Sequence, residues 1–115
     1  MKSFRELHVW NKGMQLSLAV YRLTSKFPRE EMYGLTSQLR RAAVSIPSNI
    51  AEGYGRNTRG DYKQFLGIAR GSTLEVQTQL MIALELGFLD VQAHGEVEDL
   101  SNEVSKMLYS LMRKL

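Results

Sequence analysis

Apolar residues recur at intervals of three and four over four long stretches of the chain, and no stretch alternates cleanly with period two. This spacing gathers apolar side chains on one side of an α-helix, as in helices that pack against a core. The pattern therefore predicts four helices, from about His8 to Lys26, Gly34 to Gly53, Thr58 to Leu86, and Gln92 or Gly95 to Arg113. Short connections between amphipathic helices favour an all-α fold, a single antiparallel up-down-up-down four-helix bundle covering residues 1–115.

Local signals refine the ends of these helices. Thr58 is a candidate N-cap of the third helix, and Thr36 or Ser37 of the second, because a hydroxyl can satisfy an orphan amide in the first turn. Pro47 lies inside the second predicted helix and removes one backbone hydrogen bond. We expect a kink there; the alternative is a full break, with a new helix starting at Pro47.

Two glycines in the third predicted helix, Gly67 and Gly71, lie one turn apart and disfavour helix formation. Their presence indicates a close approach of another helix.

Composition limits the class of protein. A chain of 115 residues is one domain large enough to bury a core, and the absence of cysteine excludes disulfides and thiolate metal sites. The N-terminal stretch lacks the apolar core of a signal peptide, and no apolar run reaches the length of a membrane span. We expect a soluble, cytoplasmic protein.

Charge is distributed unevenly along the chain. Residues 1–74 carry a net charge of +7 and residues 75–115 a net charge of −4. This asymmetry indicates a basic surface that meets an anionic partner, or opposite ends of protomers that attract each other. A merely solvated charged surface is the remaining alternative.

No catalytic or cofactor site is evident. Di-iron bundles use Glu-x-x-His pairs, whereas Arg5 and Val91 stand three residues before the only histidines, His8 and His94. The Gly53-Tyr54-Gly55 run has Thr58 where a dinucleotide fingerprint needs its third glycine, and no strand precedes it. Ser45 and Ser48 have no histidine nearby in the sequence. We therefore predict no enzyme activity, no metal and no cofactor.

The polar residues around Pro47 have two structural interpretations. Ser45, Ser48, Asn49 and Glu52 would satisfy the backbone that Pro47 frees, or form hydrogen bonds across a subunit interface. Glu52 follows Ile50 and Ala51 and is a candidate for a partly buried carboxylate. The residues that we assign to a subunit interface are Ser45, Pro47, Asn49, Glu52 and Tyr54.

A basic stripe gives the clearest functional signal. Its cations are spaced along one side of the third predicted helix and its entrance, and they comprise Arg56, Arg59, Lys63 and Arg70. Arg40 and Arg41 lie on the preceding helix, while Tyr54 and Tyr62 stand beside the stripe. Basic side chains bind phosphates regardless of base sequence, and aromatic rings stack on unpaired bases. These six cations therefore form a candidate contact surface for RNA or DNA.

An assembly role is the alternative to nucleic-acid binding. The last predicted helix carries an acidic outer face formed by Glu96, Asp99 and Glu103. The basic stripe of one protomer would then pair with this face on a neighbour, and the protein would be a scaffold with no nucleic-acid role.

Three runs of residues resemble a known bacterial family: Phe-Arg-Glu-Leu-His-Val-Trp at 4–10, Tyr-Gly-Leu-Thr-Ser-Gln-Leu-Arg-Arg-Ala at 33–42, and Ser-Ile-Pro-Ser-Asn-Ile-Ala-Glu-Gly-Tyr-Gly-Arg at 45–56. The family consists of four-helix-bundle proteins encoded in intervening sequences of large-subunit ribosomal RNA genes. The resemblance implies a homopentameric ring. It also implies similarity to the accessory protein of diversity-generating retroelements, a pentamer that binds reverse transcriptase and nucleic acid. The family supplies no catalytic residues to transfer.

Overall fold

Four α-helices dominate the computed structural model, which describes residues 3–115 and contains no strand among them. They are α1 (His8–Thr24), α2 (Leu35–Tyr54), α3 (Arg59–Glu85) and α4 (Val91–Arg113). The short 3-10 helices η1 (Phe4–Glu6) and η2 (Arg29–Glu31) precede α1 and α2. Met1 and Lys2, part of the N-terminal stretch inspected for a targeting signal, lie outside the described residues. The predicted all-α fold is confirmed.

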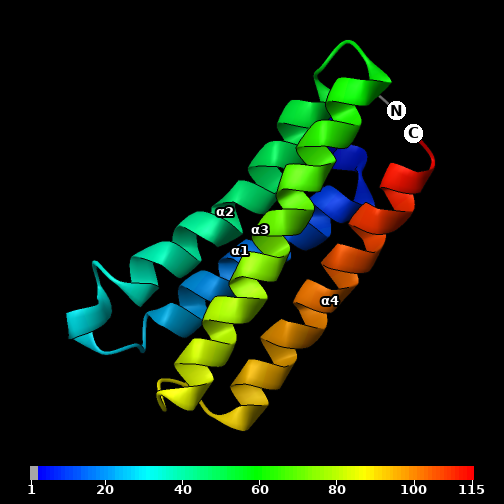
Figure 1. Ribbon diagram of the computed structural model, residues 1–115. Coiled ribbons are helices and arrows are strands. Elements are labelled where there is room, and N and C mark those ends of the chain that lie inside the picture. The colour runs from blue at the N-terminus through cyan, green and yellow to red at the C-terminus, as the bar shows by residue number, and fades with distance from the viewer. Residues whose placement is uncertain (1–2) are drawn as a thin grey trace.

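The helices form an elongated bundle of 43 × 24 × 20 Å in which successive helices run antiparallel (Figure 1). Each of α1 and α3 packs against both α2 and α4. Within residues 3–115, α1 makes no backbone-level contact with α3, and α2 makes none with α4. The four helices therefore stand at the corners of a square, with α1 and α3 on one diagonal.

The core is built from the faces that the apolar spacing predicts. All four helices contribute fully buried side chains, the largest of which are Leu16, Leu39, Ile46, Ile50, Leu66, Leu80 and Leu108. No helix among residues 3–115 is both long and apolar enough to cross a membrane.

The start of α3 agrees with the sequence prediction, and the start of α4 is shifted. Thr58 Oγ1 accepts the backbone N–H of Asp61 at 3.1 Å, so Thr58 is the N-cap, as predicted. In α4, Asp90 Oδ1 accepts the N–H of Ala93 at 2.7 Å, and the helix begins at Val91, before either predicted start. A carboxylate at this position also complements the helix dipole.

The predicted cap of α2 at Thr36 or Ser37 is wrong. The helix already begins at Leu35, and Thr36 is buried within it. Glu31 supplies the missing acceptor, because its Oε1 accepts the N–H of Leu35 at 3.0 Å. A side chain from the preceding 3-10 helix thus takes the place of an ordinary N-cap hydroxyl.

Helix α2 continues through Pro47, so the alternative of a break and restart is excluded. Because proline has no N–H, the carbonyl of Ala43 one turn earlier loses its usual helical donor. Ser17 of α1 replaces it, since its Oγ donates to the Ala43 oxygen at 2.8 Å. The interpretation that Ser45 to Glu52 satisfies this freed backbone is wrong, because the donor comes from another helix.

Close helix approach occurs at a glycine other than those predicted. A Cβ added to Gly53 would lie 2.7 Å from Phe65 Cβ, so α2 and α3 touch there at backbone level. A Cβ on Gly67 would meet Met112 Cε at an ordinary 3.6 Å, and one on Gly71 would meet nothing within 4 Å. Within this chain, the predicted close approach at Gly71 is therefore wrong.

Candidate nucleic-acid interface

Arg40 points into the groove between α1 and α2. Its Nε donates to Thr24 Oγ1 at 2.9 Å, and its guanidinium carbon lies 4.6 Å from the centre of the Tyr21 ring. These contacts hold Arg40 on the α1 side of α2. It therefore does not lie beside the basic stripe of α3.

Arg41 occupies another side of the same helix. It is exposed and lines a hollow of about 320 Å³ between α2 and α3, together with Ser45 and Glu75. The two consecutive arginines therefore point in different directions, and neither is next to the cations of α3.

Arg56 lies in the connection before α3 and is engaged within the chain. Its Nη2 lies 3.1 Å from Glu52 Oε2, and its guanidinium carbon is 4.7 Å from the Phe65 ring centre. Glu52 is exposed, so the expectation of a partly buried carboxylate there is wrong. Exposed pairs of this kind contribute about 0–1 kcal/mol, so a phosphate can displace the carboxylate at little cost.

The remaining cations of the stripe face α4. Arg59, Lys63 and Arg70 share one side of α3 with Gln77, at spacings of four and seven residues. Gln77 Nε2 donates to Ser101 Oγ of α4 at 2.9 Å, which fixes the direction of this side. The stripe therefore borders the contact between α3 and α4 rather than α2.

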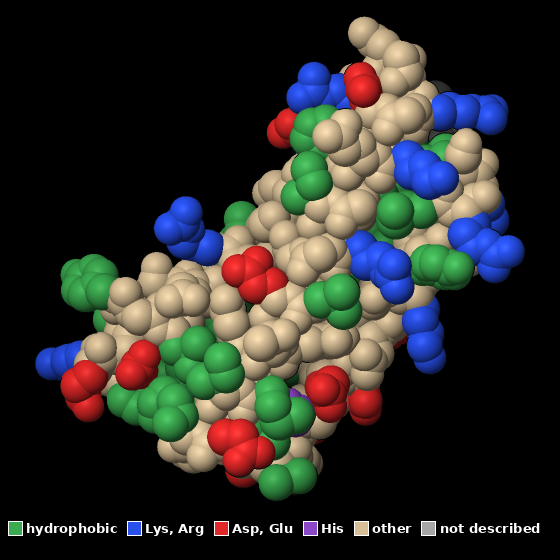
Figure 2. Space-filling view, in the orientation of Figure 1, with side chains coloured by type: hydrophobic (Ala, Val, Ile, Leu, Met, Phe, Trp, Pro, Cys, Tyr) green, Lys and Arg blue, Asp and Glu red, His purple; other side chains and the backbone are tan. Residues whose placement is uncertain are grey.

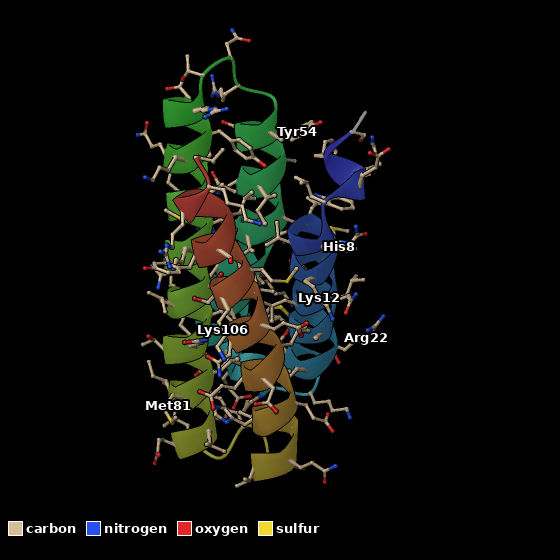
Figure 3. All side chains as sticks on the ribbon, turned by 90° about the vertical axis from the view of Figure 1, so that its right-hand side faces the viewer. His8, Lys12, Arg22, Tyr54, Met81 and Lys106 are labelled. Atoms are coloured by element: carbon tan, nitrogen blue, oxygen red, sulfur yellow. The ribbon has the colours of Figure 1, made fainter. Side chains whose placement is uncertain are left out.

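Tyr109 of α4 lies close to Arg70 of α3. The guanidinium carbon of Arg70 is 5.0 Å from the Tyr109 ring centre, and that of Arg113 is 5.8 Å away. The ring remains 48% exposed, so it lies close to two cations and still reaches solvent. Lys106 lies on the same flank of α4, one turn before Tyr109 (Figure 3).

Together these side chains form what we term the basic α3–α4 surface, made of Arg59, Lys63, Arg70, Lys106, Tyr109 and Arg113. Lys and Arg side chains gather over the N-terminal half of α3 and the C-terminal half of α4 (Figure 2). The two ion pairs among the described side chains, Lys12–Glu103 and Arg56–Glu52, involve none of them. The cations of this surface therefore have no carboxylate counter-ion among residues 3–115.

The tyrosines expected to stack on bases are engaged with each other. Tyr54 and Tyr62 are half-buried, with ring centres 6.2 Å apart at an interplanar angle of 86°. Burial raises the pKa of the Tyr62 hydroxyl, and the neighbouring Tyr54 raises it further. Both rings therefore belong to the α2–α3 packing, and Tyr109 is the exposed aromatic beside the cations.

Sequence reasoning missed the contribution of α4 to this surface. Lys106, Tyr109 and Arg113 recur at intervals of three and four, which places them along one side of a helix. The signal was present, but the net negative charge of residues 75–115 concealed it.

Most of the residues assigned to a subunit interface take part in contacts within the chain. Ser45 Oγ lies 2.9 Å from Ser72 Oγ of α3, and Asn49 Nδ2 donates to the Ser45 carbonyl at 2.8 Å. Pro47 is buried, and a Cβ on Gly13 would lie 3.6 Å from its nitrogen. That Ser45, Pro47, Asn49, Glu52 and Tyr54 contact a neighbouring protomer stays a prediction.

No group of three or more His, Cys, Asp or Glu side chains within residues 3–115 is arranged to hold a metal ion.

Comparison with known proteins identifies relatives of the whole bundle. A family model described as 23S rRNA-intervening sequence protein matches residues 5–110. A crystal structure of a protein of unknown function from the S23 ribosomal protein family of Bacteroides thetaiotaomicron superposes with a TM-score of 0.85. That structure is 22% identical, and the match covers 91% of this chain and 95% of the other, which shows a shared fold. A comparison with curated proteins finds no match.

Proposed function

This chain belongs to the family of 23S rRNA-intervening sequence proteins, and from that premise we propose that it is a homo-oligomeric, non-enzymatic module that binds RNA or DNA phosphates. The contacts are made by the basic α3–α4 surface, and the protein works in the cytoplasm. Five subunits is the number that the family resemblance implies. Similarity to the accessory protein of diversity-generating retroelements stays a prediction.

One observation carries the proposal: the Tyr109 ring lies close to the guanidinium groups of Arg70 and Arg113 and remains half exposed. Arginine and lysine neutralise phosphates and release counter-ions, which gives binding that is strong at low salt and indifferent to sequence. An exposed aromatic ring among them adds a stacking platform for an unpaired base. The surface therefore offers both of the contacts that single-stranded nucleic acid uses.

Three of the predicted cations, Arg40, Arg41 and Arg56, lie outside the basic α3–α4 surface and contribute less to the proposed binding. Arg40 is engaged with Thr24 and Tyr21, Arg41 lies across α3 from the surface, and Arg56 is paired with Glu52. Only Arg56 adjoins the N-terminal end of the surface and can join it when the exposed ion pair opens.

The test is binding of a fluorescently labelled ribosomal RNA fragment, followed by anisotropy at low salt. We expect the wild-type chain to bind and the double variant Arg59→Ala/Lys63→Ala to bind at least tenfold more weakly. A matched control is Lys26→Ala/Arg29→Ala, which removes two exposed cations from the opposite end of the bundle. The control should retain most of the wild-type affinity.

Two outcomes would reject the nucleic-acid part of the proposal. One is the absence of binding at low salt. The other is an equal loss in both double variants, because a loss that depends only on net charge does not identify a surface.

A protein-assembly scaffold is the second candidate function. Acidic side chains line the outer side of α4, at Glu96, Asp99 and Glu103, and large hydrophobic side chains are exposed on other parts of the bundle. Glu103 already pairs with Lys12 of α1 at 3.2 Å, which leaves fewer acids for a neighbour's basic residues. A chain that assembles but binds neither RNA nor DNA would favour this candidate.

A further inference from the structure

Exposed hydrophobic side chains are concentrated on two surfaces. Of the twelve large hydrophobic residues of the described chain that are classed as exposed, five lie along the α1–α2 side and five along the outward side of α3. The first set is Leu18, Tyr21, Met32, Tyr33 and Val44. The second set is Ile68, Leu74, Met81, Ile82 and Leu86, which we call the outer α3 face.

The first surface is a continuous groove. A hollow of about 530 Å³ extends from Phe4 and Trp10 to Tyr21 and Val44, and another of about 610 Å³ continues from Tyr21 and Val44 to Tyr33. We call the two together the α1–α2 groove. Its lining contains two arginines, Arg40 and Arg41, and no acidic residue.

The second surface is one side of the helix α3, and its exposed apolar residues suit packing into a groove like the α1–α2 groove. Leu74 and Met81, seven residues apart, form one apolar row. Ile68 and Ile82 belong to a second row, in which the exposed Glu75 stands between them, seven residues from each. Gly71 lies between the two rows, and an added Cβ there would meet nothing within 4 Å. Hydrophobic side chains appear at several places on the face of the molecule that Figure 2 shows. Glycine is a poor helix former, and no contact within the chain requires it at position 71.

We propose that the outer α3 face of one copy docks into the α1–α2 groove of a second copy. A helix that presents apolar residues at helical spacing is the usual occupant of a hydrophobic groove between helices. Glycine between the apolar rows allows the two backbones to approach closely. This inference rests on the homo-oligomeric part of the proposed function and specifies the surfaces that meet.

Charge favours a second copy as the occupant. The exposed acids of the outward side of α3 are Glu75 and Glu85, whereas the groove carries Arg40 and Arg41. Docking therefore brings the carboxylates of α3 towards the arginines of the groove, and the basic α3–α4 surface stays on the α4 side of the docked helix.

The contact is heterologous, because the two surfaces are different parts of the chain. Helices α1 and α3 stand on a diagonal of the bundle, so one docking event leaves a groove free on one copy and an outer α3 face free on the other. Further copies add in the same way until the rotation closes a ring.

The first test is substitution of Gly71 by leucine, with molar mass measured by light scattering on a sizing column. Leucine has room in the isolated chain and improves helix propensity, so the variant should fold and its mass should fall to that of one chain, 13.1 kDa. The matched control is Gly95→Leu in α4, where an added Cβ also meets nothing within 4 Å. The control should keep the wild-type mass.

The second test mixes two variants that each lack one surface. The groove variant is Leu18→Glu/Val44→Glu, which places charge at two exposed positions and should leave the bundle folded by circular dichroism. We expect this variant and Gly71→Leu to be monomers separately. Mixed together, they should form a one-to-one heterodimer, because the free groove of the second accepts the free outer α3 face of the first.

The outcomes separate this inference from the proposed function. A wild-type oligomer whose mass is unchanged by Gly71→Leu and by the groove variant, or a mixture that stays monomeric, overturns the docking inference alone. A wild-type chain that is a monomer at all concentrations overturns the docking inference together with the oligomeric part of the proposed function. RNA binding, measured separately, bears only on the basic α3–α4 surface.

Discussion

Ser17 shows how a single hydroxyl supports the proline in α2. It is buried in α1 and donates to the Ala43 carbonyl, the group that Pro47 leaves without a helical donor. A buried carbonyl without a partner would have a substantial energetic cost, so the hydrogen bond explains why α2 runs through the proline unbroken.

We predict that Ser17→Ala lowers the free energy of unfolding by about 1–3 kcal/mol, because it leaves the Ala43 carbonyl buried without a donor. Urea denaturation followed by circular dichroism measures the change. Ser110→Ala, at an exposed position of α4, is the control and should change stability by less than about 0.5 kcal/mol. Equal stability of the two variants would show that the carbonyl finds another partner.

Tyr109 is the residue that we expect to stack on an unpaired base. Its ring is exposed and lies near Arg70 and Arg113, so it contributes little to the core. We predict that Tyr109→Ala weakens binding of single-stranded RNA by roughly 1–3 kcal/mol, because a stacking platform is lost.

Tyr109→Phe keeps the ring and should bind nearly as well as the wild type. Fluorescence anisotropy with an unstructured oligonucleotide gives both affinities. If the phenylalanine variant loses as much affinity as the alanine variant, the hydroxyl rather than stacking carries the contact.

Ser17 and Tyr109 show which contacts of single residues could be predicted from the sequence and which could not. The consequence of Pro47 for the backbone was predictable, but its donor was sought among neighbouring residues in the sequence. Ser17 lies 26 positions from Ala43 and meets it only because α1 packs on α2. Tyr109 and its flanking cations were predictable as a helix stripe, but not as the partners of Arg70.

Among the helices, α2 and α3 form the closest pair at the end near their connection. Gly53 faces Phe65 and Tyr62 so closely that an added Cβ would overlap with the side chains and backbone of α3. Glycine at this position therefore sets the distance between the two helices, and a side chain there must push them apart.

We predict that Gly53→Ala destabilises the bundle by about 1–3 kcal/mol despite the better helix propensity of alanine. Gly95→Ala is the matched control, because the added methyl group meets open space and should stabilise α4 by up to about 1 kcal/mol. Thermal unfolding followed by circular dichroism compares them. A stabilised Gly53→Ala variant would contradict the close packing of α2 on α3.

The apolar periodicity was enough to predict that the four helices form. Their first residues were harder to predict, because some capping side chains lie at positions that the sequence analysis did not consider. Thr58 caps α3 as predicted, since the hydroxyl directly precedes the helix. The cap of α2 was predicted too late, at Thr36 or Ser37, because Glu31 of the preceding 3-10 helix provides the acceptor. The start of α4 was also predicted too late, because Asp90 caps it.

At the scale of the whole molecule, the basic α3–α4 surface and the two hydrophobic surfaces lie on different parts of the bundle. The hydrophobic surfaces are the α1–α2 groove, which also carries Arg40 and Arg41, and the outer α3 face, which also carries Glu75. This arrangement lets one chain bind a polyanion and assemble with copies of itself at the same time.

The sequence predicted a basic stripe on the third helix but grouped Arg40 and Arg41 of the preceding helix with it in one contact surface. Two consecutive residues on a helix diverge by about 100°, so at most one of them could have faced the stripe. In the structure, Arg40 lies toward α1 and Arg41 lies on the other flank of α3. Which helix borders the stripe is a property of the bundle's packing, and periodicity carries no information about it.

The most direct test of the central claim is the salt dependence of RNA binding by the wild-type chain and by Arg59→Ala/Lys63→Ala. If these two side chains each neutralise one phosphate of a single strand, the slope of log K against log salt should become shallower by about 1.4 in the double variant. The control Lys26→Ala/Arg29→Ala should keep the wild-type slope. Identical slopes in all three proteins would contradict the assignment of the basic α3–α4 surface as the site of phosphate contact.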